Sequence, residues 1–311
     1  MSLFSRISPP RRRRRGRDLS AEELFRRVGK IAVAARKKSA SPTAGDYRAV
    51  FHGRGMEFSE VREYRPGDDV RSIDWNVTAR AGAPFVKLFR EERDRTLLFL
   101  VDLSASEDFG SALATKRDLA AEATAAIALS AAENRDRVGA VLFTDRIERI
   151  RRPARGKAHA LSVVRDVLTG PLEGFGTDLA LGIRAARNLL KSRALVVIIS
   201  DFRARGYENE LGALARRHDA VALRISDPAE RRFPSRGMFR FRDAETGEIH
   251  VVDASSADFR NRWSAIAAVG ARQICLRAGV DFLELSSERA PSGDLAKFFR
   301  SRFLARAGRA G

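Results

Sequence analysis

The chain has 311 residues, enough for one large domain or two small ones with a substantial core. Hydrophobic residues make up 44% of it and charged residues 32%, a composition that excludes a disordered or fibrous protein. Its longest apolar runs are far shorter than the about 18 residues of a membrane-spanning helix. A single cysteine excludes an intramolecular disulfide, and no apolar stretch follows the N-terminal arginines as a secretory signal requires. We therefore expect a cytoplasmic protein.

The net charge of +18 is concentrated at the two ends of the chain. A run of five arginines, Arg11 to Arg15, lies near the N-terminus, and further arginines follow Lys297. Runs of like charge are usually solvated, so we expect residues 1–19 to be a disordered basic tail and residues 306–311 a second short tail. The alternative is weak binding of these ends to polyanions, either nucleic acid or the anionic surface of the inner membrane.

The first ordered element is expected at Ser20. Ser20 and Glu23 form a capping box, and apolar residues then recur at helical spacing. From residue 56 to residue 93 the pattern consists of short extended pieces, interrupted where Pro66 and Gly67 suit a type II turn. Residues 20–94 are therefore interpreted as a helix followed by a small mixed segment.

After residue 95, apolar runs of strand length alternate with segments of helical period. The expected strands are 96–101, 138–143, 194–200, 220–225 and 280–285. The expected helices are 115–134, 157–168, 179–191, 208–218, 258–276 and 294–303, with hairpins at 144–149 and 238–252. Such alternation is typical of a parallel sheet with helices on both faces. We predict an α/β domain over residues 95–305, with a doubly wound, mostly parallel sheet of the Rossmann type.

Polar side chains follow two of the central strands. Asp102, Ser104 and Ser106 come directly after the strand at 96–101, and Asp201 comes directly after the strand at 194–200. Thr177 lies in a glycine-containing loop before a predicted helix. Ligands of such sheets bind at the carboxyl ends of central strands, and a cluster of oxygen donors suits Mg²⁺ or another hard divalent cation. The simpler alternative is that Asp102 and Thr177 only cap helices.

These five residues resemble the metal-ion-dependent adhesion site of von Willebrand factor A-type domains, and the resemblance covers residues 95–305. It implies that Ser104 and Ser106 coordinate the metal through their hydroxyls and that Thr177 does so directly or through water. Asp102 and Asp201 would hold the metal chiefly through water. In that family a partner's carboxylate fills the remaining coordination position, which makes the metal a recognition element.

A second resemblance is to the bacterial domain-of-unknown-function 58 family, and it covers roughly residues 45–303. Its motifs are GMEF at 55–58, REYRPGDD at 62–69, RSIDW at 71–75, AR at 79–80, VK at 86–87, EE at 91–92, GVD at 279–281 and FF at 298–299. The resemblance implies an adaptor that works with a MoxR-type AAA+ ATPase. This chain has Glu107 where the family usually has methionine, and an added carboxylate beside the metal would change the metal's affinity or reject some ligands.

The segment between residues 64 and 80 carries interleaved charges around Ile73 and Trp75. The charged residues are Arg65, Asp68, Asp69, Arg71, Asp74 and Arg80. We expect internal ion pairs that clamp the segment to the sheet, with Trp75 as a buried anchor, because tryptophan buries a large area. A surface for a partner is the alternative.

Several enzyme classes lack their required residues. No phosphate-binding Gly-x-x-x-x-Gly-Lys motif is present, and a phosphatase of the haloacid-dehalogenase type needs an aspartate where Ser104 stands. Asp102, Glu107 and Asp201 offer carboxylates for a metal-dependent hydrolase, but the sequence indicates no positioned base. We therefore predict no enzyme but a metal-dependent protein-interaction module, whose partners are a MoxR-type ATPase and a client that presents a carboxylate. A metal-dependent hydrolase and a polyanion-binding protein are the alternatives.

Overall fold

The computed structural model describes residues 56–91, 95–111, 114–170, 172–231, 236–242, 248–259 and 270–307. Several predictions fall wholly or partly outside these residues: the basic tail at 1–19, the helix that begins at Ser20, the turn of the hairpin at 238–252, the middle of the helix at 258–276 and most of the tail at 306–311. No helix among the described residues is long and apolar enough to cross a membrane.

A six-stranded sheet forms the centre of the protein, with strand order β10-β7-β6-β3-β4-β5. The strands are β3 (Thr96–Asp102), β4 (Arg137–Phe143), β5 (Ile147–Ala154), β6 (Leu195–Ser200), β7 (Asp219–Ser226) and β10 (Asp281–Ser286). All neighbours are parallel except β5, which runs antiparallel to β4. The expected short hairpin at 144–149 is wrong in extent, because β5 continues to Ala154 as an edge strand, where Pro153 is tolerated.

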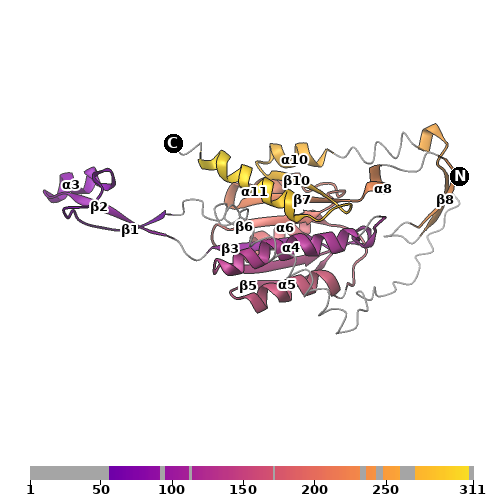
Figure 1. Cartoon of the computed structure of the whole chain (residues 1–311), viewed down its shortest axis with the longest axis horizontal. Helices are drawn as coiled ribbons and strands as arrows, with labels where there is room; N and C mark the ends of the chain where they lie inside the picture. The colour runs from indigo at the N-terminus through magenta and orange to yellow at the C-terminus, as the bar shows by residue number, and fades with distance from the viewer. Residues whose placement is uncertain are drawn as a thin grey trace.

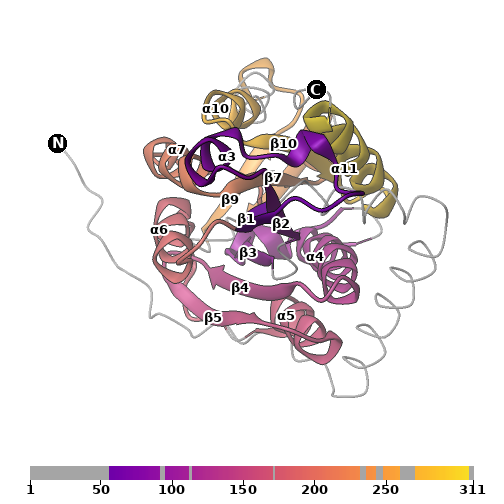
Figure 2. The same ribbon diagram turned by 90° about the vertical axis from the view of Figure 1, so that its left-hand side faces the viewer.

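Helices cover both faces of this sheet (Figure 2). One layer holds α4 (Lys116–Glu133), α5 (Lys157–Thr169) and α11 (Ser292–Ala307). The other holds α6 (Leu179–Leu189), α7 (Glu208–Arg217) and α10 (Ala271–Arg277). Side chains of β3 alternate between the two layers, so that Phe99 packs with α4 and Leu100 packs with α6. The predicted α/β, doubly wound fold is confirmed.

The segment before the sheet forms an arm that projects from it (Figure 1). The arm contains β1 (Met56–Glu63), paired antiparallel with β2 (Phe85–Glu91), and between them the short helices η1 (Val70–Ser72) and α3 (Trp75–Ala81). The predicted type II turn is present: the Asp68 N–H donates to the Arg65 carbonyl at 3.0 Å, and Gly67 has φ of 108°.

The structure corrects two expectations for the arm. The sequence pattern predicts extended chain where helix α3 lies. Asp74 caps the N-terminus of this helix, and Gly82, with φ of 72°, ends it in the left-handed conformation that favours glycine. Trp75 was expected as a buried anchor but is 70% exposed, because it lies on a short helix at the tip of the arm. Arg62 and Asp68 form an ion pair at 2.7 Å within the arm itself rather than a clamp to the sheet.

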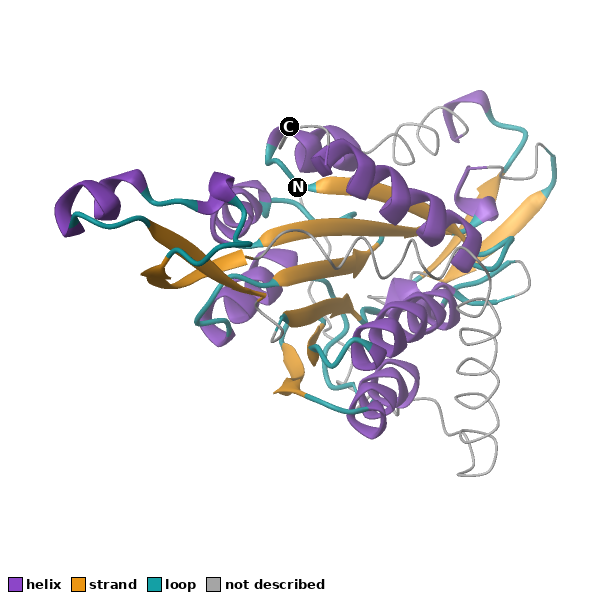
Figure 3. Ribbon diagram, turned by 60° about the vertical axis from the view of Figure 1, so that its left-hand side comes forward, coloured by secondary structure: helices purple, strands orange, loops and turns teal. Residues whose placement is uncertain are grey.

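A second two-stranded hairpin lies at the end of the sheet opposite the arm (Figure 3). It consists of β8 (Met238–Arg242) and β9 (Ile249–Asp253), and it follows the short helix α8 (Pro228–Arg231). The hairpin predicted at 238–252 is thus confirmed in its two strands.

Candidate metal centre

The centre lies where β3 and β6 end, at the edge of the sheet opposite the arm. The two strands are adjacent and parallel, with Val101 paired to Ile199, so their carboxyl ends meet. Asp102 is the last residue of β3, and Asp201 directly follows β6. Both side chains are buried, with 1% and 2% exposure.

Hydrogen bonds from neighbouring residues orient the Asp102 carboxylate. Its Oδ1 accepts from the Ser104 N–H at 2.9 Å, which closes a tight turn after β3. Its Oδ2 accepts from the Ser200 Oγ at 2.8 Å, and the same Ser200 Oγ accepts from the Phe202 N–H at 3.0 Å. The two strand ends are therefore joined through Asp102 and Ser200.

The two serines complete the cluster with Asp201. The hydroxyls of Ser104 and Ser106 lie 3.2 Å apart, and Ser106 Oγ donates to Asp201 Oδ2 at 3.1 Å. The structure thus brings four of the five predicted ligands together.

The backbone after β6 holds Asp201 in place through an unusual conformation. Phe202 has φ of 56°, in the left-handed region that costs a non-glycine residue about 1–2 kcal/mol. Its ring is fully buried near Tyr207, with ring centroids 6.1 Å apart, and this packing offsets the strain. The Arg203 N–H then donates to Asp201 Oδ1 at 3.1 Å.

Thr177, the fifth predicted ligand, lies in a loop that adjoins the serine turn. The Phe175 carbonyl of this loop accepts from the Ala105 N–H at 3.4 Å. The Glu148 carboxylate accepts from the Gly174 N–H at 2.8 Å, and a Cβ on Gly174 would come within 2.0 Å of Thr144 Oγ1, so only glycine fits there. Among the described residues, Thr177 makes no hydrogen bond to the other four predicted ligands.

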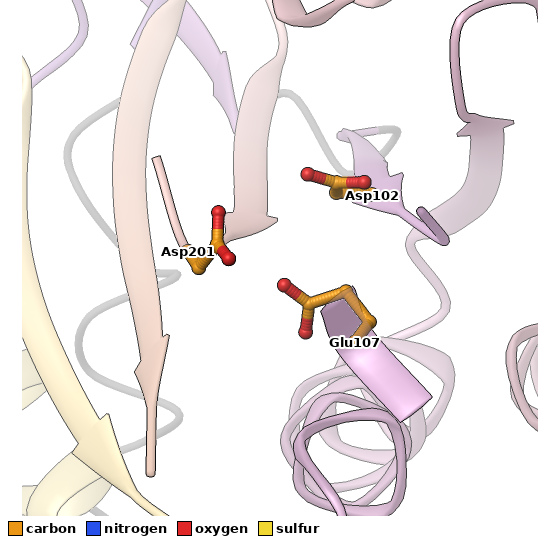
Figure 4. Close-up of side chains that lie close together, drawn as sticks. All are labelled: Asp102, Glu107 and Asp201. Atoms are coloured by element: carbon orange, nitrogen blue, oxygen red, sulfur yellow. The ribbon is translucent and has the colours of Figure 1, made fainter. Parts of the chain in front are cut away.

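The cluster also contains three charged residues that the sequence prediction left out of the ligand set. Lys116, the first residue of α4, places its Nζ 2.9 Å from Asp201 Oδ2 and 3.0 Å from Glu230 Oε1. Glu107 directs its carboxylate toward Asp102 and Asp201 (Figure 4), and its Oε1 lies 3.8 Å from Lys116 Nζ. Lys116 and Glu107 are almost completely buried, and Glu230 is 7% exposed.

The proximity of these groups shifts their pKa values. Burial raises the pKa of Asp102 to about 6, and the charge of Asp201 adds to the rise. Burial also raises the pKa of Glu107 well above its usual value, despite the opposing charge of Lys116. Burial alone would raise the pKa of Asp201, but Lys116 outweighs it and lowers that pKa. Lys116 itself has a raised pKa, since its carboxylate neighbours outweigh its burial, and it stays protonated.

The charges of the cluster fit a divalent cation. Four buried carboxylates face two cationic groups, Lys116 and an Arg203 guanidinium whose Nη2 lies 3.5 Å from Glu230 Oε2. When all four carboxylates are ionised, the cluster carries a net charge of −2. The donor set consists of carboxylate and hydroxyl oxygens, which suit a hard cation such as Mg²⁺.

The sequence carries one signal for Lys116. A lysine in the first turn of a helix is opposed by the helix dipole, so its presence there indicates a compensating anion. Glu230 follows a different strand and carries no comparable signal.

Residues 60–273 match the family described as "Protein of unknown function DUF58". The chain belongs to the DUF58 family. A relative from Mycobacterium bovis, named "Uncharacterized protein Mb1516", is 35% identical over 292 residues, which cover 92% of each chain. "Uncharacterized protein Rv1480" from Mycobacterium tuberculosis matches with the same identity and coverage.

Solved structures resemble this DUF58 chain in fold alone. An aerotolerance-related membrane protein from Bacteroides fragilis has a TM-score of 0.46 at 13% identity and covers 68% of this chain and 99% of its own. The conserved hypothetical protein BatB from Bacteroides thetaiotaomicron has a TM-score of 0.43 at 12% identity, with the same coverage. The SpRpn10 VWA domain has a TM-score of 0.39 at 14% identity and covers 65% of this chain and 93% of its own.

Proposed function

We propose that this DUF58 chain is a metal-dependent protein-interaction module that serves as an adaptor of a MoxR-type AAA+ ATPase in the assembly or maturation of client proteins. The observation that carries the proposal is the buried cluster of oxygen donors at the carboxyl edge of the sheet, with its deficit of positive charge. Asp102, Ser104, Ser106 and Asp201 would hold Mg²⁺, with Thr177 in the adjoining loop. A bound divalent cation would attract a partner's carboxylate, since the ion is the largest local charge.

The surroundings of the centre suit a protein partner. Helix α8 supplies Glu230 to the cluster and leads to the β8–β9 hairpin, which lies at the same end of the molecule (Figure 1). Three apolar side chains of the hairpin are exposed: Met238 by 68%, Val251 by 59% and Ile249 by 48%. Exposed apolar surface beside a charged centre is typical of protein interfaces.

An adaptor needs a second surface, and the arm offers one. The arm lies at the opposite end of the sheet from the hairpin, and it exposes Trp75 on α3 at its tip and Val70 at the start of η1. Tryptophan is enriched at the energetic centres of interfaces. The two ends can therefore contact two different proteins at once.

The proposal assigns no reaction to this chain. The sequence lacks a phosphate-binding Gly-x-x-x-x-Gly-Lys motif, so the ATPase partner would supply the energy. This partnership would place the chain in the cytoplasm or at the inner face of the membrane.

The test is a pull-down of a purified MoxR-type ATPase from the same organism by the full chain. It compares the wild type, Asp201→Ala, the matched control Asp258→Ala at an exposed site, and a chain without residues 1–19, each with and without EDTA at low and high salt. We expect EDTA and Asp201→Ala to abolish capture at both salt levels, because a metal contact persists where surface charge is screened.

Two outcomes would contradict the proposal. If EDTA and Asp201→Ala leave capture intact while deletion of residues 1–19 abolishes it, charge alone drives the association. If no form captures the ATPase, the partnership itself is wrong.

A further inference from the structure

Glu107 is buried in the cluster without a hydrogen bond. It follows Ser106 on the short helix η2 (Ala105–Asp108), and 1% of it is exposed. Neither oxygen of its carboxylate accepts a hydrogen bond from any described residue. An ionised carboxylate buried without donors is costly to the fold, so a cation beside Glu107 would stabilise its ionised form.

Lys116 meets that charge only in part, as an ion pair without a hydrogen bond. Its Nζ lies at hydrogen-bond distance from Asp201 and Glu230, at 2.9 and 3.0 Å, whereas Glu107 Oε1 is 3.8 Å away. The ammonium thus directs its donors to the other two carboxylates. Glu107 is left to face the space between itself, Asp102 and Asp201 (Figure 4).

The three carboxylates are spaced for one shared cation. One oxygen each of Asp102, Glu107 and Asp201 lies within 4.8 Å of the other two. Oxygen ligands bind hard divalent cations at about 2.0–2.6 Å, so ligands on opposite sides of one ion are about 4–5 Å apart. Asp102 and Asp201 come from two strand ends and Glu107 from η2, so a single ion would bridge three elements.

We propose that Glu107 is a direct ligand of the cation at this centre and takes the coordination position that a partner's carboxylate would otherwise fill. The inference rests on the proposed function, because it assumes a divalent cation there. A partner's carboxylate must then displace Glu107 before it can reach the ion. Glu107 therefore competes with the partner's carboxylate for this position on the cation, and the centre discriminates against carboxylates that bind the cation weakly.

The test uses Mn²⁺ alone as the probe of the full chain. Calorimetry measures the affinity for Mn²⁺, and water-proton relaxation reports the exchangeable waters on the bound ion. The variants are Glu107→Gln, which removes the charge at equal size, and Glu107→Asp, which keeps the charge but withdraws the carboxylate. Glu230→Gln is the matched control, because it removes one charge from the same buried cluster at a side chain that pairs with Lys116.

We expect both Glu107 variants to bind Mn²⁺ at least about tenfold more weakly than the wild type. The bound ion should also gain exchangeable water, since water fills the vacated position. Acetate should then displace this water in Glu107→Gln at lower concentration than in the wild type. Glu230→Gln should leave the water count of the wild type unchanged.

Each contrary outcome identifies which idea fails. Wild-type affinity and water count in Glu107→Gln would overturn the inference and leave the metal centre intact. Equal losses of affinity in Glu107→Gln and Glu230→Gln, without a change in bound water, would show a general effect of charge and overturn direct ligation. If the wild type binds no Mn²⁺, both the inference and the metal dependence of the proposed function are wrong.

Discussion

Lys116 Nζ lies 2.9 Å from Asp201 Oδ2, so the first residue of α4 supplies a buried cation to the strand end that carries the candidate metal ligands. The position is unfavourable for a lysine in isolation, because the N-terminus of a helix already carries partial positive charge. The carboxylates around it reverse that balance. The contribution of Lys116 to stability and the binding of a divalent cation can therefore be tested separately.

We predict that Lys116→Met destabilises the protein. Methionine fits the same space but removes the ammonium that contacts both Asp201 and Glu230, and removing one partner of a buried ion pair typically costs about 3–5 kcal/mol. Urea unfolding followed by circular dichroism should show this loss in the free energy of unfolding.

Lys191→Met is the matched control for this prediction, since Lys191 is exposed near the end of α6. It should change the free energy of unfolding by less than about 0.5 kcal/mol. An unfolding midpoint of Lys116→Met equal to that of the wild type would show that the cluster does not need its lysine.

We predict one Mg²⁺ site per chain, lost in Asp102→Ala and Ser104→Ala. Two hydrogen bonds hold the Asp102 carboxylate in the cluster, and the Ser104 hydroxyl lies beside that of Ser106. Each of the two substitutions therefore removes an oxygen donor from the cluster. Mg²⁺ at about 100 times its dissociation constant should stabilise the wild type by about 2.7 kcal/mol. Calorimetry and thermal unfolding measure the two effects.

Ser301→Ala, on the exposed surface of α11, is the matched control and should bind Mg²⁺ as the wild type does. Unaltered Mg²⁺ binding in both site variants would rule out this cluster as the metal site.

The sequence predicted the sheet and the clustering of four candidate ligands, because both follow from local pattern. The apolar runs of β3 and β6 predict buried parallel strands, and the carboxyl ends of such strands meet at one edge. Asp102 and Asp201 therefore had to lie close together once the strands were adjacent.

Contacts between distant segments could not be predicted in this way. Lys116 and Glu230 are 114 residues apart and meet only because of how α4 and α8 sit at the same edge. The prediction that Trp75 is buried failed for a related reason. The size of its side chain predicts burial, but the tertiary position of the arm decides whether the side chain can pack against a core. Helix α3 depends on caps at Asp74 and Gly82, which the pattern of short extended pieces obscured.

The exposure of Trp75 gives a third prediction. Trp75→Ala should change the free energy of unfolding by less than about 0.5 kcal/mol, because 70% of the residue is already in solvent. Phe299→Ala is the buried counterpart, since Phe299 is fully enclosed between α11 and the sheet, and it should cost about 3–5 kcal/mol. A comparable loss in both variants, measured by urea unfolding, would mean that Trp75 is packed in solution.

The fourth prediction concerns the pH dependence of an ion-pair cluster remote from the metal centre. Asp166 of α5 is 3% exposed and accepts hydrogen bonds from Arg149 Nη1 at 3.1 Å and Arg151 Nε at 2.5 Å, both on β5. Burial alone would raise the pKa of Asp166, but the two arginines outweigh it and lower that pKa below the ordinary 3.8.

Because the pKa of Asp166 is lower in the folded protein than in the unfolded chain, its ion pairs contribute their full stability above about pH 4. That stability is lost as the pH falls through the folded-state pKa, where the unfolded chain binds the proton more readily. Asp166→Asn should therefore lower the free energy of unfolding by about 1–3 kcal/mol at neutral pH, and the gap to the wild type should narrow below about pH 4. Urea unfolding from pH 7 to about pH 3 measures the gap.

Glu133→Gln, at the exposed end of α4, controls for removal of one acidic charge and should show little difference from the wild type at neutral pH. A gap for Asp166→Asn that stays constant down to pH 3 would mean that its cost comes from packing and not from the paired charge.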